Sequence, residues 1–333
     1  MGMKAIALPR EMADKELRRL LRSDSVDRTH RITADGNFVY VPLLTDHVSS
    51  KYGIVDLDPI DRTLPGAPVE RVKEKAACLG IPLEAIPERW VRYGDSIVIR
   101  YDGPEPSVIA GIFSGVLGVK SVYRYRGGVR YNTRKPSVEL LFGPGGSVTH
   151  LENGIRYTFD PAEIMFSPGN VGIRTSMKHL NVRNKTVFDM FAGIGYFSIP
   201  IAKYGSPNHI YAAEINPVSY GYLESNIAKN KVKESFTTYN DDCKSVTLHE
   251  KVDLIIMGHY SSPSFLQDAL KNLNPGGIIM IHHLVSTENL PSSAAEIEKK
   301  LPDICASYKI LSSKVVKSYS PHHWHVVTEV QIA

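Results

Sequence analysis

The chain has 333 residues, 43% of them hydrophobic, and 39 lysines and arginines against 35 acids give a net charge of +4. This is the composition of an ordinary globular protein with room for two or three domains. No apolar run reaches the roughly 18–20 residues of a membrane helix and no signal-peptide core is present, so we expect a cytoplasmic protein without membrane contact. Three widely spaced cysteines, without a C-x-x-C pair, predict neither a metal site nor a disulfide framework.

Residues 1–58 are predicted to form a small separate unit. In "EMADKELRRLL" the apolar residues Ala13, Leu17, Leu20 and Leu21 share one helical face. "HRITADGNFVYVPLL" predicts a hairpin that turns at Asp35-Gly36. Prolines then crowd "DPIDRTLPGAPVE", and we expect a linker over residues 59–67.

Residues 68–165 are predicted to form an α+β middle domain. A helix is expected around residues 72–79, and "DSIVIRY" and "SVELLFG" are strand candidates. Asn153-Gly154, in "VTHLENGIRYTFD", marks a further hairpin turn. The irregular alternation of helix, strand and glycine-rich turn favours α+β over a parallel sheet in this part.

Lysines and arginines crowd residues 120–135, "KSVYRYRGGVRYNTRK", without an acid among them. Five are candidate RNA-binding residues: Lys120, Arg124, Arg126, Arg130 and Lys135. Cations neutralise phosphates, and the interleaved rings of Tyr123, Tyr125 and Tyr131 could stack on unpaired bases. Because crowded cations repel one another without an anionic partner, we predict nucleic-acid contact, against the alternative of a solvated strand face.

From about residue 166 strands and helices alternate regularly. Strands are predicted at residues 186–189, 210–214, 236–239, 252–257 and 278–281. This alternation predicts a parallel, doubly wound sheet within residues 166–333. The tail "YKILSSKVVKSYSPHHWHVVTEVQIA" differs, and predicts an antiparallel hairpin at the sheet edge.

The stretch "VFDMFAGIGYF" marks the passage from a strand to a helix that begins near Phe197. Gly193 and Gly195 allow a tight turn and a close approach of the backbone to a ligand. A dinucleotide fingerprint requires a third glycine where Ser198 stands, which weakens a pyrophosphate interpretation. Asp189, at the strand end, would repel a phosphate but suits a ligand that carries an ammonium group.

The next two strands also end in acids. Glu214 follows Gly193 by 21 residues, the spacing at which a carboxylate accepts hydrogen bonds from ribose hydroxyls. Asp241 and Asp242 could meet an adenine amino group, or could instead cap the next helix. An amine, a ribose and an adenine without phosphates describe S-adenosylmethionine. The alternative is a turn of this type without that ligand.

Several separated motifs occur in a familiar order: "ENGIRYTFDPAEIMFSPGNVGIR", "DMFAGIGYFSIPIAKYG", "AAEINPVSYGYLESNIAKNKV" and "WHVV". Over residues 85–333 the chain resembles two sister families that act on position 37 of tRNA. One is the tRNA guanine-N1-methyltransferase family, and the other is the wybutosine-synthesis aminocarboxypropyl transferase family. Residues 1–58 resemble the accessory domain with which the methyltransferases grip the tRNA body.

The fourth strand distinguishes the sisters. Its end, "IIMGHYSSPSF", resembles the Met-Gly-Tyr type turn of the transferases and not the Asn-Pro-Pro type turn of the methyltransferases. The methyltransferases also need a carboxylate base just before the arginine of the "FSP" segment. Ile173 stands there, and an apolar residue cannot accept a proton.

The resemblance therefore implies transfer of the 3-amino-3-carboxypropyl group of S-adenosylmethionine to C7 of 4-demethylwyosine in the anticodon loop of tRNA-Phe. The implied catalytic residues are Arg134, His259 and Tyr260; the alternatives are a surface arginine and packing roles. Cofactor-binding positions are Ser167, Arg174, Asp189, Phe191, Gly193, Gly195, Glu214, Ile215, Asp241, Asp242 and Met257. For Ser167 and Arg174 the alternatives are a helix cap and an exposed arginine, and His283 and His325 are expected to be structural.

The expected fold is a class I S-adenosylmethionine-dependent, Rossmann-like α/β sheet with an antiparallel C-terminal hairpin, an α+β middle domain and a small N-terminal domain. We expect a monomer. Two other functions stay open. A tRNA guanine-N1-methyltransferase is favoured by the N-terminal unit, and a tRNA-binding protein without catalysis would fail to turn S-adenosylmethionine over.

Overall fold

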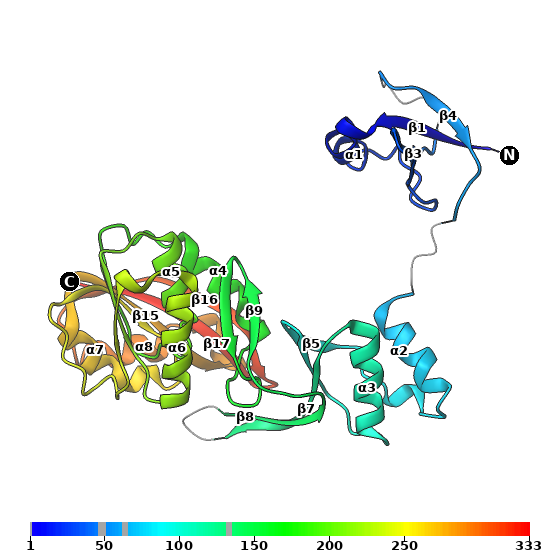
Figure 1. Cartoon of the computed structure of the whole chain (residues 1–333). Helices are drawn as coiled ribbons and strands as arrows, with labels where there is room; N and C mark the ends of the chain where they lie inside the picture. Colours follow the sequence, from blue (N-terminus) through cyan, green and yellow to red (C-terminus); the bar gives the residue numbers. More distant parts are fainter. Residues whose placement is uncertain (1, 46–50, 62–65, 131–134) are drawn as a thin grey trace. The chain divides into compact units, whose positions relative to one another are not determined.

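The computed structural model describes residues 2–45, 51–61, 66–130 and 135–333, with the backbone alone for residues 128–130 (Figure 1). The chain divides into two compact units, Met1–Arg71 and Val72–Ala333. The division falls in the first turns of helix α2 (Pro68–Ala77). Arg134 and Tyr131 lie outside the described residues.

In its described residues the N-terminal unit contains a four-stranded sheet and the helix α1, before α2 begins. The strand order is β2-β3-β1-β4. Its elements are β1 (Met3–Pro9), α1 (Ala13–Leu20), β2 (Thr33–Ala34), β3 (Phe38–Pro42) and β4 (Ile54–Leu57). The predicted turn is present, since the Asp35 carboxylate accepts the Asn37 and Phe38 amides at 2.8 and 2.7 Å. Of the predicted helical face, Ala13 and Leu20 are buried but Leu21 is exposed, because α1 ends before it.

The second unit begins with a small sheet of order β5-β6-β7-β8. Its elements are β5 (Trp90–Tyr93), β6 (Ser96–Ile99), α3 (Pro106–Leu117), β7 (Ser121–Arg130) and β8 (Lys135–Phe142). Helices α2 and α3 bury Val72, Ile109 and Phe113 against Ile97 and Val122 of the strands. The mixture of antiparallel pairs with one parallel pair, β6 with β7, has the α+β character predicted for this stretch.

A short hairpin, β9 (Val148–Glu152) and β10 (Ile155–Phe159), precedes the large sheet and turns at Asn153-Gly154. Its apolar side chains share a core with the large domain, where Tyr157 and Phe159 pack with Ile194 and Leu223. The hairpin is thus packed against the large domain just before the "FSP" segment in the chain.

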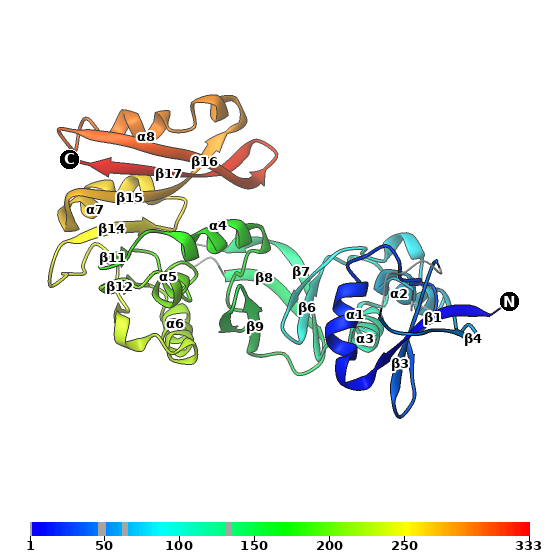
Figure 2. The same cartoon turned by 90° about the horizontal axis from the view of Figure 1, so that it is seen from above.

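The large sheet has seven strands in the order β13-β12-β11-β14-β15-β17-β16. Its strands are β11 (Thr186–Asp189), β12 (His209–Ala213), β13 (Phe236–Tyr239), β14 (Val252–Met257), β15 (Leu273–Ser286), β16 (Tyr308–Ser320) and β17 (His323–Ile332). The first five are parallel, and β17 pairs antiparallel with both β15 and β16 (Figure 2). The predicted Rossmann-like sheet and its antiparallel C-terminal hairpin are confirmed.

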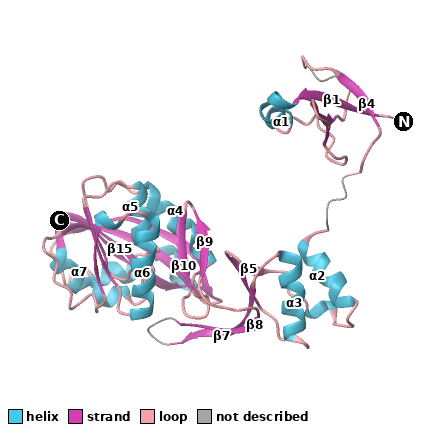
Figure 3. Cartoon of the chain, in the orientation of Figure 1, coloured by secondary structure: helices cyan, strands magenta, loops and turns pink. Residues whose placement is uncertain are grey.

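Helices cover both faces of this sheet (Figure 3). They are α4 (Val171–Ser176), α5 (Ser198–Tyr204), α6 (Pro217–Asn230), α7 (Leu266–Asn272) and α8 (Ala295–Lys300). Ile199 of α5 and Leu223 of α6 pack on Ala212, whereas Leu266 of α7 and Ile297 of α8 pack on the face that carries Phe188 and Ile255. Because β11, β12 and β14 are parallel, their carboxyl ends lie along the same edge of the sheet. Ligands of such folds bind at this edge.

No helix in the described parts of the chain combines the length and the apolar character needed to cross a bilayer.

Candidate active site

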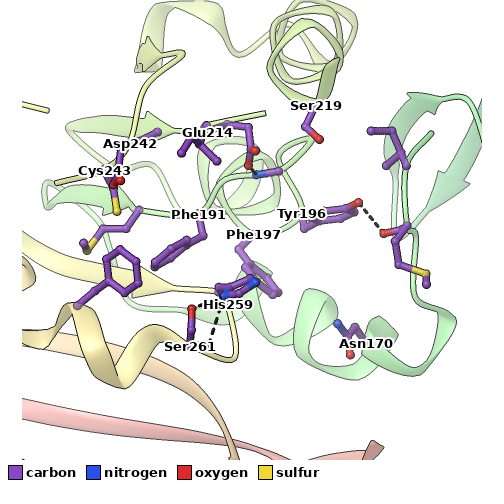
Figure 4. A pocket seen from close by; sticks show the side chains of 18 of the residues that line it. Asn170, Phe191, Tyr196, Phe197, Glu214, Ser219, Asp242, Cys243, His259 and Ser261 are labelled. Carbon is purple, nitrogen blue, oxygen red and sulfur yellow. Dashed lines mark hydrogen bonds between the residues drawn. The ribbon is translucent and has the colours of Figure 1, made fainter. Parts of the chain in front are cut away.

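A cavity of about 330 Å³ lies at the carboxyl ends of β11, β12, β13 and β14 (Figure 4). Its size is within the range of pockets that hold small-molecule ligands. The walls come chiefly from five segments, namely the glycine turn after β11, the acid-bearing ends of β12 and β13, the turn after β14, and the "FSP" loop. Nine predicted residues line it: Ser167, Arg174, Phe191, Gly193, Glu214, Ile215, Asp241, Asp242 and His259.

The glycine turn forms the floor of the pocket. Gly193 has φ +57°, and a Cβ there would lie 2.5 Å from the ring of Tyr196, so only glycine fits. The turn is tied to the sheet, since the Met190 amide donates to the Ile256 carbonyl and the Ala192 amide to the Ala213 carbonyl. Gly195, also predicted as a cofactor contact, lies outside the pocket wall. A Cβ there would strike Ile199 at 2.3 Å, so Gly195 serves helix packing.

Glu214 joins the turn to the next strand end. One carboxylate oxygen accepts the Gly193 amide and the other accepts the Asn216 amide, both at 2.8 Å. Burial raises the pKa of Glu214, while these two amides oppose the shift. The carboxylate is therefore held in a fixed orientation at the pocket wall, where its remaining lone pairs can accept from a ligand.

Asp189 was expected to meet the ligand, and the structure corrects this. Its side chain is fully buried and accepts the Phe191 amide at 3.3 Å from beneath the turn. Burial raises the pKa of Asp189 to about 7. One carboxylate oxygen has no hydrogen-bond partner in the described structure. Asp189 thus stabilises the turn through its hydrogen bond to the Phe191 amide and does not line the cavity.

The two acids after β13 stand at one end of the pocket with Ile215, Cys243 and Phe265. Asp241 accepts the Asp242 amide at 2.7 Å, and Asp242 accepts the Lys244 amide at 3.0 Å. The alternative of a helix cap is wrong, because the element that follows in the chain is strand β14. Ile215 is 61% exposed at the rim and offers an apolar surface to a flat ring.

The "FSP" loop forms the other end of the pocket. Arg174, only 2% exposed, donates to both oxygens of Glu152 at 2.6 and 2.7 Å and to the Ser167 carbonyl at 3.0 Å. Its guanidinium also lies over the ring of Phe166. The alternative of an exposed arginine is therefore wrong: Arg174 lines the pocket, and its hydrogen bonds tie strand β9 to the loop. The cap alternative for Ser167 is wrong as well, because its hydroxyl accepts Lys317 at 2.6 Å and caps no helix.

The turn after β14 contributes Gly258, His259 and Ser261 to the pocket wall, but neither Met257 nor Tyr260. Gly258 packs against Phe197, where a Cβ would lie 2.8 Å from the ring. The His259 ring stacks on Phe191 and its Nδ1 accepts the Ser261 amide at 3.2 Å. Met257 is buried in the core, outside the wall. Tyr260, also expected in the base pocket, packs edge-on against Tyr319 and His325 instead.

The predicted structural histidines are buried away from the pocket. His325 Nε2 lies 3.0 Å from His282 Nδ1, and His283 Nε2 lies 2.9 Å from the Thr328 hydroxyl. Burial lowers the pKa of His283 to about 4 and keeps it neutral. These rings therefore pack β15 against β17.

The basic stretch is less exposed than its sequence indicates. Arg124 is buried and shares Glu139 with Arg126, each at 2.7 Å, and Lys120 pairs with Asp95 at 2.8 Å. The prediction that these cations repel one another without an anionic partner was wrong, because Asp95 and Glu139 from neighbouring segments pair with them. Tyr123 is buried, so it cannot stack on a base. Lys135 is exposed at the start of β8, and Arg130 ends β7 where only the backbone is described.

Several lining residues escaped the sequence analysis. Tyr196 and Phe197 belong to the glycine stretch itself and could have been found by reading on from Gly195. Others include Glu163, Met165, Asn170 and Phe265, which lie in stretches quoted above without having been assigned to the site, and Cys243, which lies in none of them. Only the fold brings them to one cavity.

Comparison with known proteins decides between the two sister families. Residues 148–310 match the TRM5/TYW2 methyltransferase domain, residues 81–146 the TYW2 N-terminal domain, and residues 5–51 the tRNA methyltransferase 5 N-terminal domain. The chain is 36% identical over 255 residues to a tRNA(Phe) (4-demethylwyosine(37)-C(7)) aminocarboxypropyltransferase of Pyrococcus horikoshii, covering 75% of this chain and 91% of that one. The chain belongs to the TYW2 aminocarboxypropyltransferase family.

Solved TYW2 structures contain S-adenosylmethionine or a related ligand, in agreement with the predicted cofactor. The P. horikoshii TYW2 complex with MeSAdo has a TM-score of 0.71 and 33% identity, covering 79% of this chain and 98% of that one. A Methanocaldococcus jannaschii TYW2 structure contains AdoMet, with a TM-score of 0.59, 28% identity and coverage of 74% and 100%. Trm5b of Pyrococcus abyssi, a tRNA (guanine(37)-N(1))-methyltransferase, is 27% identical over 99% of both chains. The N-terminal unit thus resembles Trm5, and the rest of the chain resembles TYW2.

Proposed function

We propose that this protein is a tRNA 4-demethylwyosine aminocarboxypropyl transferase. It moves the 3-amino-3-carboxypropyl group of S-adenosylmethionine to C7 of 4-demethylwyosine at position 37 of tRNA-Phe. The observation that carries the proposal is the identity of 36% over 91% of a relative with this activity, together with the TYW2 N-terminal domain match. S-adenosylmethionine supplies a carbon bound to a sulfonium, which a nucleophilic base carbon can attack.

The pocket residues support this function by holding the reactants in place. Glu214 offers a half-buried carboxylate to ribose hydroxyls, and Ile215, Asp241 and Asp242 offer an apolar surface and acceptors to an adenine. Displacement at a sulfonium carbon needs no strong acid or base to begin, so most of the catalysis is positioning and exclusion of water. The position of the γ-carbon of the S-adenosylmethionine arm relative to the target base then decides whether the arm or the methyl group is transferred.

His259 is proposed to contact the target base. Because the Ser261 amide can only donate, it requires Nδ1 of His259 to be an acceptor, and the neutral ring then carries its proton on Nε2. The ring lines the cavity and stacks on Phe191, so it can pack against a modified guanine. Arg134 is proposed from sequence resemblance to orient the reacting groups, and Arg134→Ala is expected to lower transfer while leaving cofactor affinity intact.

The anticodon loop of tRNA-Phe is the proposed RNA segment, and the exposed Lys135 with Arg126 are proposed to contact it. We propose a monomer acting in the cytoplasm. The three cysteines are free, as in proteins of a reducing compartment.

The by-product of the reaction tests the proposal. Transfer of the aminocarboxypropyl group leaves 5′-methylthioadenosine, whereas methyl transfer leaves S-adenosylhomocysteine. Chromatography of a reaction with 4-demethylwyosine tRNA is expected to show methylthioadenosine in step with modified tRNA. Accumulation of S-adenosylhomocysteine alone would contradict the proposal.

A second candidate is a tRNA (guanine37-N1)-methyltransferase. The match of residues 5–51 to a tRNA methyltransferase 5 domain favours it. Ile173, next to Arg174, argues against this candidate. Its side chain packs with the apolar core and offers no proton acceptor for the N1 proton.

A further inference from the structure

The end of the hairpin β16–β17 stands beside the cavity, although no residue of the hairpin lines it. Lys317 of β16 marks how close the hairpin comes, because its ammonium donates to the hydroxyl of Ser167, a residue of the cavity wall, at 2.6 Å. Tyr319 follows Lys317 by two residues, about 7 Å along an extended strand. The ring of Tyr319 is therefore near the rim of the cavity.

The turn after β14 brings the same ring to the rim from a second direction. His259 and Ser261 line the cavity, and Tyr260 stands between them in the chain. The rings of Tyr260 and Tyr319 meet with centroids 5.0 Å apart and planes at 75°. On another side Tyr260 packs against the buried ring of His325, at 4.9 Å. Tyr319 is thus held against a part of the turn that is itself packed on β17.

A local irregularity of β16 accounts for the direction of Tyr319. Ser318 pairs with Trp324 and Ser320 with His323, so Tyr319 is an extra residue on its strand, as in a β-bulge. Bulges change the direction of a side chain and are common beside active sites. Tyr319 is 52% exposed, and a T-shaped contact covers at most one face of a ring. A large aromatic surface at the rim therefore remains open to a ligand.

The charge of the hairpin indicates which kind of ligand this surface suits. Residues 308–328 contain three lysines and three histidines, and no acid. Lysines attract the phosphates of a nucleic acid, and an exposed aromatic ring stacks on any unpaired base. An exposed ring on an acid-free, lysine-bearing hairpin favours a nucleotide over an apolar protein partner.

The proposed reaction creates a base that needs such a surface. A target base that enters a cavity of this kind must leave the stack of its neighbours, and unstacking costs free energy. The nucleotides on either side of position 37 then lose a stacking partner. An aromatic ring fixed at the rim of the cavity can replace the lost partner for one of them.

We propose that Tyr319 is a stacking platform for the unpaired base next to the target, at position 36 or 38 of the tRNA. Tyr260 holds the platform from the side, and the platform contacts neither S-adenosylmethionine nor the target base. This inference deepens the proposed function and rests on it for the identity of the RNA.

A double-mutant cycle between protein and RNA tests the platform. The full chain and its Tyr319→Ala variant are titrated in filter binding with tRNA-Phe that carries 4-demethylwyosine. The same tRNA is also made without a base at position 36, and without a base at position 38. Tyr319→Ala is expected to weaken the intact tRNA about tenfold. With one of the two abasic tRNAs, wild type and variant should bind within about twofold of each other, because the stacked base is already missing.

Two further variants and one other ligand complete the test. Tyr319→Phe keeps the ring and should bind intact tRNA within about twofold of wild type. Leu311→Ala, at the other end of β16 and 41% exposed, is the matched control and should have no effect. The affinity for S-adenosylmethionine, measured by calorimetry, should stay within about twofold in every variant.

Three results would overturn the platform while leaving the proposed function intact. They are native tRNA affinity in Tyr319→Ala, a loss that persists with both abasic tRNAs, and a loss in Tyr319→Phe as large as in Tyr319→Ala. A wild-type protein that does not bind the intact tRNA would overturn the proposed function as well.

Discussion

Glu214 ties the glycine turn to the wall of the cavity. Its carboxylate accepts the Gly193 and Asn216 amides and lines the cavity. Glu214→Gln keeps one acceptor oxygen but loses the charge, so we expect S-adenosylmethionine affinity to fall by about 1.5–3 kcal/mol. Calorimetry checks this, and native affinity in the variant would remove Glu214 from the ligand's contacts.

Asp189 gives the fold a pH dependence of defined sign. Its pKa rises from 3.8 to about 7 through burial, so the folded state holds a proton that the unfolded state releases between those values. Its contribution to stability is complete below pH 3.8 and is lost as the pH rises toward 7. Relative to wild type, Asp189→Asn should therefore gain stability with rising pH over this interval.

Urea unfolding of both proteins at several pH values measures that difference. The buried histidines of β15 act in the opposite direction, since burial lowers the pKa of His283 to about 4, and their effect cancels in the comparison. A wild-type-minus-variant difference that does not change between pH 4 and 7 would contradict the assignment of a buried, proton-holding Asp189.

Residue roles were predictable where spacing along the chain fixes them. Glu214 could be placed from its distance to Gly193, because parallel strands bring their carboxyl ends together. The burial of Arg174 could not be, because it depends on Glu152 of the hairpin β9–β10, which supplies the arginine's partner. The contact between Lys317 and Ser167 could not be predicted either, because only the folded sheet brings these two distant residues together.

Helix α6 holds the free edge of strand β10 with two asparagines, one turn apart. Asn226 accepts the Thr158 amide at 2.7 Å and donates to the Ile194 carbonyl at 3.1 Å. Asn230 accepts the Arg156 amide at 2.9 Å and donates to its carbonyl at 2.8 Å. An otherwise unpaired strand edge is thus satisfied by side chains, which fixes the hairpin and the "FSP" loop after it.

Asn226→Ala is expected to lower the free energy of unfolding by about 2–4 kcal/mol, because it leaves several buried backbone groups unpaired. Denaturant unfolding measures the loss. Asn208→Ala, at an exposed position before β12, should change stability by less than about 0.5 kcal/mol. Equal stability of the two variants would show that water or another group replaces the asparagine.

Elements with a strong period or a turn signal were predictable. The β–α alternation of residues 186–281 and the turns at Asp35-Gly36 and Asn153-Gly154 are confirmed by the sheet and its hairpins. Strands β1 and β4 escaped notice because they pair across more than 40 residues, so no short hairpin pattern in the sequence marks them. The length of β15 also exceeded the predicted strand, since β17 extends its pairing to Ser286.

At the scale of the whole molecule, the N-terminal unit is proposed to hold the tRNA body while the second unit binds the cofactor. Every residue that lines the cavity lies between residues 163 and 265. A chain shortened to begin at residue 66 should therefore keep its S-adenosylmethionine affinity within about twofold. Its tRNA affinity should fall at least about tenfold, through lost phosphate contacts. Filter binding measures this, and unchanged tRNA affinity would contradict a gripping role.

A TYW2-type catalytic unit, joined to a Trm5-type N-terminal unit, is proposed to move the arm of S-adenosylmethionine and not its methyl group. The most direct measurement supplies S-adenosylmethionine labelled either in the methyl carbon or in the carboxyl carbon. The acceptors are tRNA-Phe with guanosine or with 4-demethylwyosine at position 37. We predict carboxyl label in the demethylwyosine tRNA and no label in the guanosine tRNA. Methyl label in the guanosine tRNA, without carboxyl label in either, would contradict the account.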